Sequence, residues 1–187
     1  IAGVEGNGQT ELSEVLAGLS DFASGEVKLN DTSIAGKSVR EIRDLGMAYI
    51  AEDRMVEGVA GDMSIKMNIM ADRFTKKEFK SGLFMNGKKI DEIARQYIQD
   101  FEILCDGPDQ PVRMLSGGNI QKVIVAREIN DQPDLLIACQ PTRGVDISSI
   151  EYIHNKIIEQ RNQGTAVLLI SAELSEIMGL SDQIGML

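Results

Sequence analysis

Glycines near the start of the chain have the spacing of a phosphate-binding loop. In the segment Gly3-Val4-Glu5-Gly6-Asn7-Gly8-Gln9-Thr10, four residues separate Gly3 from Gly8. Loops of this kind direct backbone N–H groups at phosphate oxygens, and the helix that follows adds the positive end of its dipole. Gln9 stands where the pattern expects Lys, while Thr10 keeps a hydroxyl that suits Mg²⁺. Glycine-rich turns are common, so this loop alone is a weak indication of phosphate binding.

A second glycine pair, in Leu115-Ser116-Gly117-Gly118-Asn119, precedes a predicted helix. Small residues allow a loop to approach a phosphate closely, the Ser116 hydroxyl can donate a hydrogen bond, and the helix N-terminus attracts negative charge. The alternative interpretation is an ordinary helix N-cap followed by flexible glycines. The motifs nearby decide between the two.

The segments around these loops resemble, in the same order, the motifs of ATP-binding-cassette (ABC) ATPases. Leu115–Asn119 resembles the signature motif, whose usual form is Leu-Ser-Gly-Gly-Gln. Four further segments resemble the Q-loop, the Walker B strand, the D-loop and the switch-histidine segment: Tyr49–Arg54, Pro133–Thr142, Arg143–Asp146 and Ile170–Glu173. The resemblance covers nearly the whole chain.

Several positions depart from the family pattern in one chemical direction. Gln9 removes a cation from the phosphates, a contact that contributes up to about 4 kcal/mol at about 4 Å and an effective dielectric near 20. Cys139 replaces a carboxylate that would help to hold Mg²⁺, and Gln140 replaces the carboxylate that would accept a proton from water. Losing a general base costs roughly two to four orders of magnitude in rate.

Ala172 stands where the resemblance expects the switch histidine, and Glu52 where a Gln is usual. We therefore expect weak or absent hydrolysis at this loop, with nucleotide binding weakened. The resemblance implies two sets of nucleotide-contacting residues. The set for the chain's own loop is Gly3, Gly6, Asn7, Gly8, Gln9, Thr10, Glu11 and Glu52. The set that acts across a head-to-tail dimer is Leu115, Ser116, Gly117, Gly118, Asn119 and Asp146. ATP and Mg²⁺ are the implied cofactors, with Thr10 as a weak Mg²⁺ ligand.

The chain combines an intact signature with degraded Walker A and Walker B motifs. In this combination it resembles the second cassette of the tandem ATPases that energise bacterial import of simple sugars and nucleosides. The resemblance implies a partner half in the same polypeptide, transmembrane permease subunits and, indirectly, a substrate-binding protein. It places the protein at the cytoplasmic face of the membrane. The pair Cys139-Gln140 before Pro-Thr-Arg-Gly favours the nucleoside branch.

Other functions remain to be weighed. Repair-type ABC proteins insert long coiled coils, and the interval from Glu52 to Leu115 is short and lacks sustained heptads. Translation-type members usually need basic surfaces, whereas the net charge here is −10. The same charge argues against a nucleic-acid partner. A non-catalytic ABC domain that senses ATP and regulates assembly stays open as the alternative.

These motifs need elements to position them. We expect helices at residues 11–19, 39–45, 88–104, 115–129 and 147–160, and strands at residues 26–30, 47–51, 135–139 and 166–171. This order predicts an α/β fold of the P-loop NTPase type, with a mostly parallel sheet, a small antiparallel part and an inserted helical subdomain. We expect one domain over residues 1–187, with the core at 1–57 and 120–187 and the helical part at 58–119.

The remaining features bound the interpretation. No apolar run approaches the roughly 20 residues of a membrane helix. Cys105 and Cys139 lack metal-ligand spacing and are expected to be reduced thiols. Four methionines, at positions 55, 63, 67 and 70, are expected either to contact the permease or to fill a small core. His154 receives no role, and Arg127 with Glu128 is expected on a solvated or salt-bridging face. Both ends look cut, and a strand is expected before residue 1.

Overall fold

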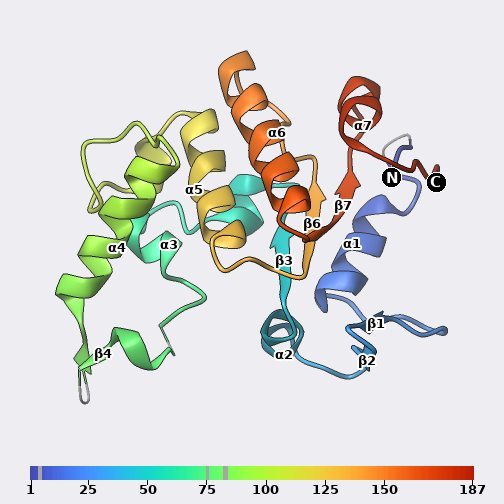
Figure 1. Cartoon of the computed structure of the whole chain (residues 1–187), viewed down its shortest axis with the longest axis horizontal. Coiled ribbons are helices and arrows are strands. Elements are labelled where there is room, and N and C mark those ends of the chain that lie inside the picture. The colour runs from blue at the N-terminus through green and yellow to red at the C-terminus, as the bar shows by residue number, and fades with distance from the viewer. Residues whose placement is uncertain (4–5, 75, 82–83) are drawn as a thin grey trace. The chain divides into compact units, whose positions relative to one another are not determined.

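A parallel sheet organises the first part of the chain. The computed structural model describes residues 1–187 except 4–5, 75 and 82–83. Three parallel strands are hydrogen-bonded in the order β3 (Met47–Ile50), β6 (Leu135–Cys139) and β7 (Ala166–Ile170) (Figure 1). All three are apolar runs, as expected for parallel strands that are covered on both faces. The predicted α/β fold is confirmed.

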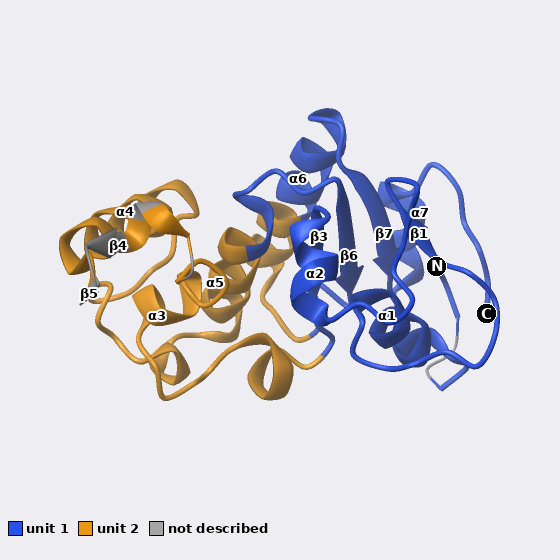
Figure 2. Cartoon of the chain, turned by 90° about the horizontal axis from the view of Figure 1, so that it is seen from below, with its two compact units in different colours: residues 1–52, 128–143, 154–187 blue, residues 53–127, 144–153 orange. Residues whose placement is uncertain are grey.

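The chain divides into two compact units, coloured separately in Figure 2. Unit 1 comprises residues 1–52, 128–143 and 154–187, and unit 2 comprises residues 53–127 and 144–153. Helices α5 (Gly117–Ile129) and α6 (Ile147–Asn162) contribute residues to both units. Each unit is described by itself below.

Unit 1 also contains three further helices, α1 (Gln9–Ala17), α2 (Val39–Asp44) and α7 (Leu174–Leu180). Helix α2 begins with a capping box, because the Ser38 side chain accepts from the Glu41 N–H and the Glu41 side chain accepts from the Ser38 N–H. The helices predicted at the positions of α1 and α2 are present, whereas the sequence analysis predicts no helix at the position of α7.

A small antiparallel pair precedes α2. Strands β1 (Lys28–Leu29) and β2 (Thr32–Ser33) are joined by Asn30 and Asp31. Both joining residues have positive φ, of 50° and 59°, which is the geometry of a type I′ hairpin turn. Asn and Asp tolerate this conformation better than most residues, so the sequence favours a turn here.

The core of unit 1 is formed by the parallel sheet β3-β6-β7 together with segments that precede it in the sequence. Its buried members come from α1, α2, the loop after β2 and all three strands: Ala17, Ile34, Ile42, Met47, Ile137, Cys139 and Ile170. Cys139 is thus a core residue as well as the last residue of β6. A small thiol can be buried in such surroundings without a charge partner, which a carboxylate could not.

The parallel arrangement continues beyond β7. Ala2 forms parallel bridges with Ser171 and with Met186, and the amino terminus of Ile1 donates to the Leu169 carbonyl. Residues 1–2 therefore lie in strand-like contact with the end of β7. This contact places Gly3, the first glycine of the loop, beside the carboxyl end of the sheet.

Unit 2 is mainly helical within the described residues. Its elements are a π-helical turn η1 (Arg54–Gly58), α3 (Ile65–Ile69), α4 (Gly87–Asp100), the antiparallel pair β4 (Lys80–Ser81) and β5 (Phe84–Met85), and 3₁₀ turns at Lys77–Phe79 and Val112–Met114. Ser64 and Asn86 cap α3 and α4 through their side chains.

Helix α4 ends earlier than the sequence pattern predicts. The expected helix ran to Leu104, but α4 stops at Asp100. Glu102 has a left-handed φ of 50°, and the Ile103 N–H donates to the Ile98 carbonyl at 2.9 Å. Apolar residues continue beyond the helix because Ile103 is buried in the turn that follows, so periodicity alone extends the prediction too far.

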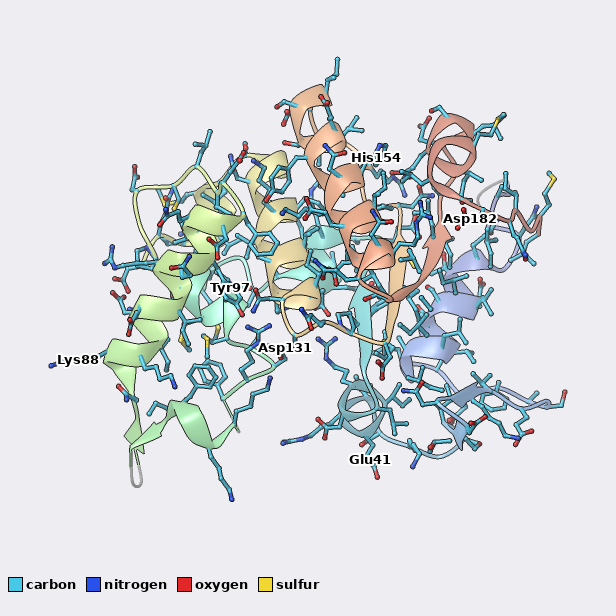
Figure 3. The ribbon with its side chains drawn as sticks, viewed as in Figure 1. Glu41, Lys88, Tyr97, Asp131, His154 and Asp182 are labelled. Carbon is cyan, nitrogen blue, oxygen red and sulfur yellow. The ribbon has the colours of Figure 1, made fainter. Side chains whose placement is uncertain are left out.

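A buried arginine joins three segments of unit 2. Arg73 is 2% exposed, donates to the Tyr97 hydroxyl, and donates to the Arg127 carbonyl at 2.9 Å. Its guanidinium lies 5.1 Å from the centre of the Tyr97 ring, a cation–π arrangement. Figure 3 places Tyr97 on α4.

None of the helices in the described part of the chain is long and apolar enough to cross a membrane.

Candidate functional site

The residues of the glycine loop line a small cavity in unit 1. Its lining comes from the loop and α1, from Glu52, and from the ends of β6 and β7: Gly3, Gly6, Gln9, Thr10, Ser13, Glu52, Cys139, Gln140, Ile170, Ser171 and Ala172. Ligands of open α/β sheets bind at this carboxyl edge of the strands. The cavity measures about 20 Å³, which is room for little more than one water molecule.

The side chain of Gln9 folds back over the loop. Gly8 precedes α1 with a left-handed φ of 101°, and Gln9 is the first residue of the helix. Gln9 is 8% exposed, and its Oε1 accepts the Asn7 N–H at 3.0 Å. A β-carbon at Gly3 would overlap the Gln9 side-chain nitrogen, so only glycine permits this approach. Val4 and Glu5, the other members of the loop, lie outside the described residues.

Glu52 is held by two partners at the mouth of the cavity. Its Oε1 accepts from Arg143 Nη1 at 2.6 Å, and its Oε2 accepts from the Thr10 hydroxyl at 3.2 Å. The Glu52 side chain is 24% exposed and that of Arg143 is 55% exposed. Glu52 therefore links the Arg143 guanidinium to the hydroxyl that the sequence marks as a metal ligand.

Three of the four positions where the sequence predicts a replaced catalytic residue lie together at the ends of β6 and β7. Cys139 is buried among apolar side chains. Gln140 follows it with a left-handed φ of 47°, and its Oε1 accepts the Ala172 N–H at 3.2 Å. The structure thus joins the Gln predicted at the general-base position to the Ala predicted at the switch-histidine position.

This donor set fits Mg²⁺ poorly. Mg²⁺ prefers hard oxygen ligands, and carboxylates above all among protein side chains. Glu52 supplies the carboxylate among the lining residues, and its charge is already paired with Arg143. The described residues contain no cluster of three or more His, Cys, Asp or Glu side chains that could hold a metal ion.

Two features of the described loop residues disfavour phosphate. The Asn7 N–H belongs to the set of amides that a phosphate-binding loop would direct at its ligand, and here it is bonded to Gln9. The remaining predicted contact on α1, Glu11, is an exposed carboxylate in the first helical turn, which repels phosphate.

A buried carboxylate holds the loop after β6. Glu176 on α7 is 3% exposed, and its Oε1 accepts from the Thr142 hydroxyl at 2.7 Å. The same oxygen lies 2.8 Å from His154 Nε2 on α6, where Figure 3 labels the histidine. Thr142 precedes Arg143, so this contact anchors the turn that presents Arg143 to Glu52. Sequence reasoning assigned no role to His154.

The signature segment lies in unit 2, at the start of α5. Ser116 is exposed, and its Oγ accepts the Asn119 N–H at 3.4 Å, which is an N-cap contact. Asn119 Nδ2 also donates to Ser116 Oγ, at 2.8 Å, while Asn119 Oδ1 accepts the Leu104 N–H at 2.8 Å. Leu115 is buried and anchors the segment.

The D-loop segment is built onto the signature. Asp146 accepts from the hydroxyls of Ser148 and Ser149, at 2.6 and 2.8 Å, and from the Ser149 N–H at 3.0 Å. These hydrogen bonds hold the pKa of Asp146 well below its ordinary range. A β-carbon at Gly118 would overlap Ser149 Oγ and lie 2.6 Å from Asp146 Oδ2. The second glycine of the signature is therefore required by packing against the D-loop.

Arg54, from the Q-loop segment, contacts both the D-loop and the signature. Its Nη2 donates to the Gly144 carbonyl at 3.0 Å, and the same nitrogen would lie 3.2 Å from a β-carbon at Gly117. The sequence places Arg54 in the Q-loop motif without a role. No pattern in the sequence indicates this contact, because Gly144 lies 90 residues from Arg54.

Solved structures share this fold. A dimeric ATP-binding cassette in a post-hydrolysis state, bound to ADP and Pi, matches with a TM-score of 0.75 over 94% of this chain and 74% of that chain, at 18% identity. A nucleotide-free ATP-binding cassette from an ABC transporter matches with a TM-score of 0.75 over 97% of this chain and 72% of that chain, at 22% identity. At these identities the likeness defines the fold class.

Residues 1–143 match the ABC transporter family, and the chain belongs to it. The nucleoside import ATP-binding protein NupA of Lactococcus lactis subsp. cremoris is 41% identical over 100% of this chain and 37% of its own length. The guanosine import ATP-binding protein NupO of Bacillus subtilis is 43% identical with the same coverage. The ribose import ATP-binding protein RbsA of Geobacillus kaustophilus is 34% identical over 98% of this chain and 37% of its length. The chain thus spans little more than a third of these relatives.

Proposed function

We propose that this chain is one nucleotide-binding half of an importer ATPase, and that its signature and D-loop complete the ATP site of a partner half. Its own loop no longer supports hydrolysis. One observation carries the proposal: the preserved motif residues belong to unit 2, and the replaced residues belong to unit 1. Unit 2 holds the signature segment Leu115–Asn119, Asp146 and Arg54, which contact one another. These segments keep the hydrogen-bond donors that a phosphate would need. In unit 1, four of the replaced residues hold hydrogen bonds within the unit: Gln9, Gln140, Ala172 and Glu52.

The chemistry of the chain's own loop supports the second part of the proposal. Gln140 carries no proton-accepting carboxylate, and its amide oxygen is already bonded to the Ala172 N–H. Cys139 packs in the core, and Glu52 is paired with Arg143. Among the described residues of this site, no group both holds Mg²⁺ and activates water, so we derive no hydrolytic step at this loop.

The names of the relatives support a proposal for the imported molecule. NupA and NupO are named for nucleoside and guanosine import and RbsA for ribose import, so we propose a simple sugar or a nucleoside as the imported molecule. We further propose that the partner half belongs to the same polypeptide and that permease subunits hold the ATPase at the cytoplasmic face of the membrane. A substrate-binding protein would deliver the substrate.

The proposed contact with the permease is residues 58–104 of the helical part, together with Met55 just before them. The four candidate methionines divide in the structure. Met55, Met63 and Met67 are 44%, 53% and 37% exposed, whereas Met70 is fully buried. Exposed methionines form adaptable apolar surface, so the first three suit a contact with helices or loops of another chain. Met70 belongs to the core instead.

Trapping with orthovanadate and a photoreactive ATP analogue tests the proposal, because vanadate holds nucleotide only where the transition state forms. In the full-length ATPase with its permease, we expect labelled peptides from the partner half's loop and none from residues 1–17. Equal labelling of both loops would contradict the proposal. If the loop of this chain bound the analogue but turnover did not depend on Ser116, the regulatory alternative would replace it.

A further inference from the structure

We infer that Asn119 is a positioning residue, which orients the Ser116 hydroxyl so that its hydrogen points away from the protein toward a phosphate held by the partner half. The inference rests on the proposed function. It concerns how a signature that ends in Asn, where Gln is usual, presents its serine.

The orientation of the Asn119 amide is determined by its contacts. The Leu104 N–H can only donate, so the atom that it contacts at 2.8 Å must be the amide oxygen of Asn119. The amide nitrogen then faces Ser116 Oγ at 2.8 Å. An amide nitrogen has no acceptor capacity, so Ser116 Oγ must be the acceptor in this contact.

Ser116 Oγ accepts a second N–H, from the backbone of Asn119 at 3.4 Å. A hydroxyl oxygen has two acceptor positions and one hydrogen, and both acceptor positions are filled here. In the part of the chain that the structure describes, no acceptor contacts the Ser116 hydroxyl hydrogen. Because Ser116 is exposed, that hydrogen is directed outward as a donor.

The amide of Asn119 is anchored at its other side. The turn that carries Leu104 follows α4, and Lys122 Nζ donates to the Glu102 carbonyl in the same turn at 3.0 Å. Asn119 and Lys122 are three residues apart on α5 and therefore share one face of the helix. Lys122 Nζ also lies 4.4 Å from the centre of the Tyr152 ring. Asn119 thus bonds to a turn that is itself held in place, which limits rotation of its side chain.

Substituting Asp for Asn119 reverses the direction of the hydrogen bond with Ser116 and changes the size of the side chain little. In Asn119→Asp, one oxygen still accepts the Leu104 N–H, but the other accepts from Ser116 and draws its hydrogen inward. Removing one preorganised donor typically lowers turnover by 100-fold or more, so we expect Asn119→Asp to lower kcat by roughly 100-fold. Asn119→Gln keeps an amide, and we expect it to retain most of the activity.

A double-mutant cycle separates positioning from other effects. ATP turnover is measured in the full-length ATPase with its permease for Ser116→Ala, Asn119→Asp and both together, with melting temperature as the check on folding. If Asn119 acts through Ser116, Ser116→Ala lowers kcat by roughly 100-fold and Asn119→Asp has little further effect in that background. Asn162→Asp, at the end of α6, is the control for the added charge.

Two results would overturn the inference, and they are distinguishable. If Ser116→Ala lowers turnover but the two substitutions multiply independently, Asn119 does not act through Ser116, while the proposed function stands. If Ser116→Ala leaves turnover unchanged, the signature does not serve a partner's ATP site, and the proposed function fails with the inference.

Discussion

Arg54 Nη2 donates to the main-chain carbonyl of Gly144 at 3.0 Å, which ties the segment after the Q-loop to the D-loop. The same nitrogen lies close to Gly117, so one guanidinium contacts both segments that are proposed to face the partner half. We expect Arg54→Ala to release the D-loop and lower turnover at the partner's site by roughly 10-fold, since small misplacements of positioning groups cost up to about 100-fold.

The control for this prediction is Arg40→Ala, which removes an arginine that is 65% exposed on α2. Its ion pair with Asp44 is on the surface and is expected to contribute little. Comparable turnover in the Arg54→Ala and Arg40→Ala proteins would refute the role given to Arg54.

The Asp146 carboxylate should titrate at unusually low pH. The hydroxyls of Ser148 and Ser149 stabilise its ionised form, so its pKa lies below that of the unfolded chain. The stabilisation is therefore present above about pH 4 and is lost as the pH falls below that value. Ser148→Ala is expected to raise the pKa of Asp146 and Ser148→Thr to leave it low, as followed by carboxyl NMR. An unchanged pKa in Ser148→Ala would show that this hydrogen bond is not responsible.

Glu128 should contribute to stability because it is buried and bonded twice. Its side chain is 1% exposed, and its Oε2 lies 2.8 Å from Arg43 Nη2 and accepts the Tyr49 N–H of β3 at 3.2 Å. The sequence predicts a solvated or salt-bridging residue, and the structure shows a salt bridge that is buried on its acidic side. We expect Glu128→Ala to lower the free energy of unfolding by about 2–4 kcal/mol, measured by urea denaturation.

Glu26→Ala is the matched control, because the ion pair of Glu26 with Lys28 is more than half exposed on both sides. Its loss should change the free energy of unfolding by less than about 1 kcal/mol. Equal effects of the two substitutions would argue that burial of Glu128 is unimportant.

The two thiols should react at very different rates. Cys139 is 3% exposed in the core of unit 1, whereas Cys105 is partly exposed. Thiol reagents need access to the sulfur, so we expect the native protein to release one equivalent of thionitrobenzoate quickly and a second only after unfolding. Cys105→Ser should abolish the fast phase. A fast phase that survives this substitution would mean that Cys139 is accessible and does not pack as described.

The elements that sequence patterns predicted best are those whose own composition determines them. β6 and β7 are continuous apolar runs, and α4 carries a clear apolar stripe. Helix α3 has only five residues, too few to be stable without tertiary contacts, and no periodicity marks it. It forms because Ser64 caps it and because the Asn68 side chain bonds to both the N–H and the carbonyl of Ala60.

The candidate site was predictable as a set of residue types and not as a set of contacts. Spacing identified Gln9, Gln140 and Ala172 as replacements and left open what their side chains contact. The bonds from Asn7 to Gln9, from Ala172 to Gln140 and from Arg143 to Glu52 depend on where distant segments meet after folding. The same holds for Arg54 and Asn119, whose partners lie 90 and 15 residues away in the sequence.

ATP turnover of the full-length ATPase carrying Ser116→Arg, compared with Gln140→Ala, tests the central claim most directly. A bulky cation at position 116 blocks the approach of the signature to a phosphate, so we expect Ser116→Arg to nearly abolish turnover. Gln140→Ala removes an amide from a loop that no longer hydrolyses ATP, so turnover should change little. Unchanged turnover in Ser116→Arg, or a large loss in Gln140→Ala, would contradict the assignment of this chain as the half that completes its partner's site.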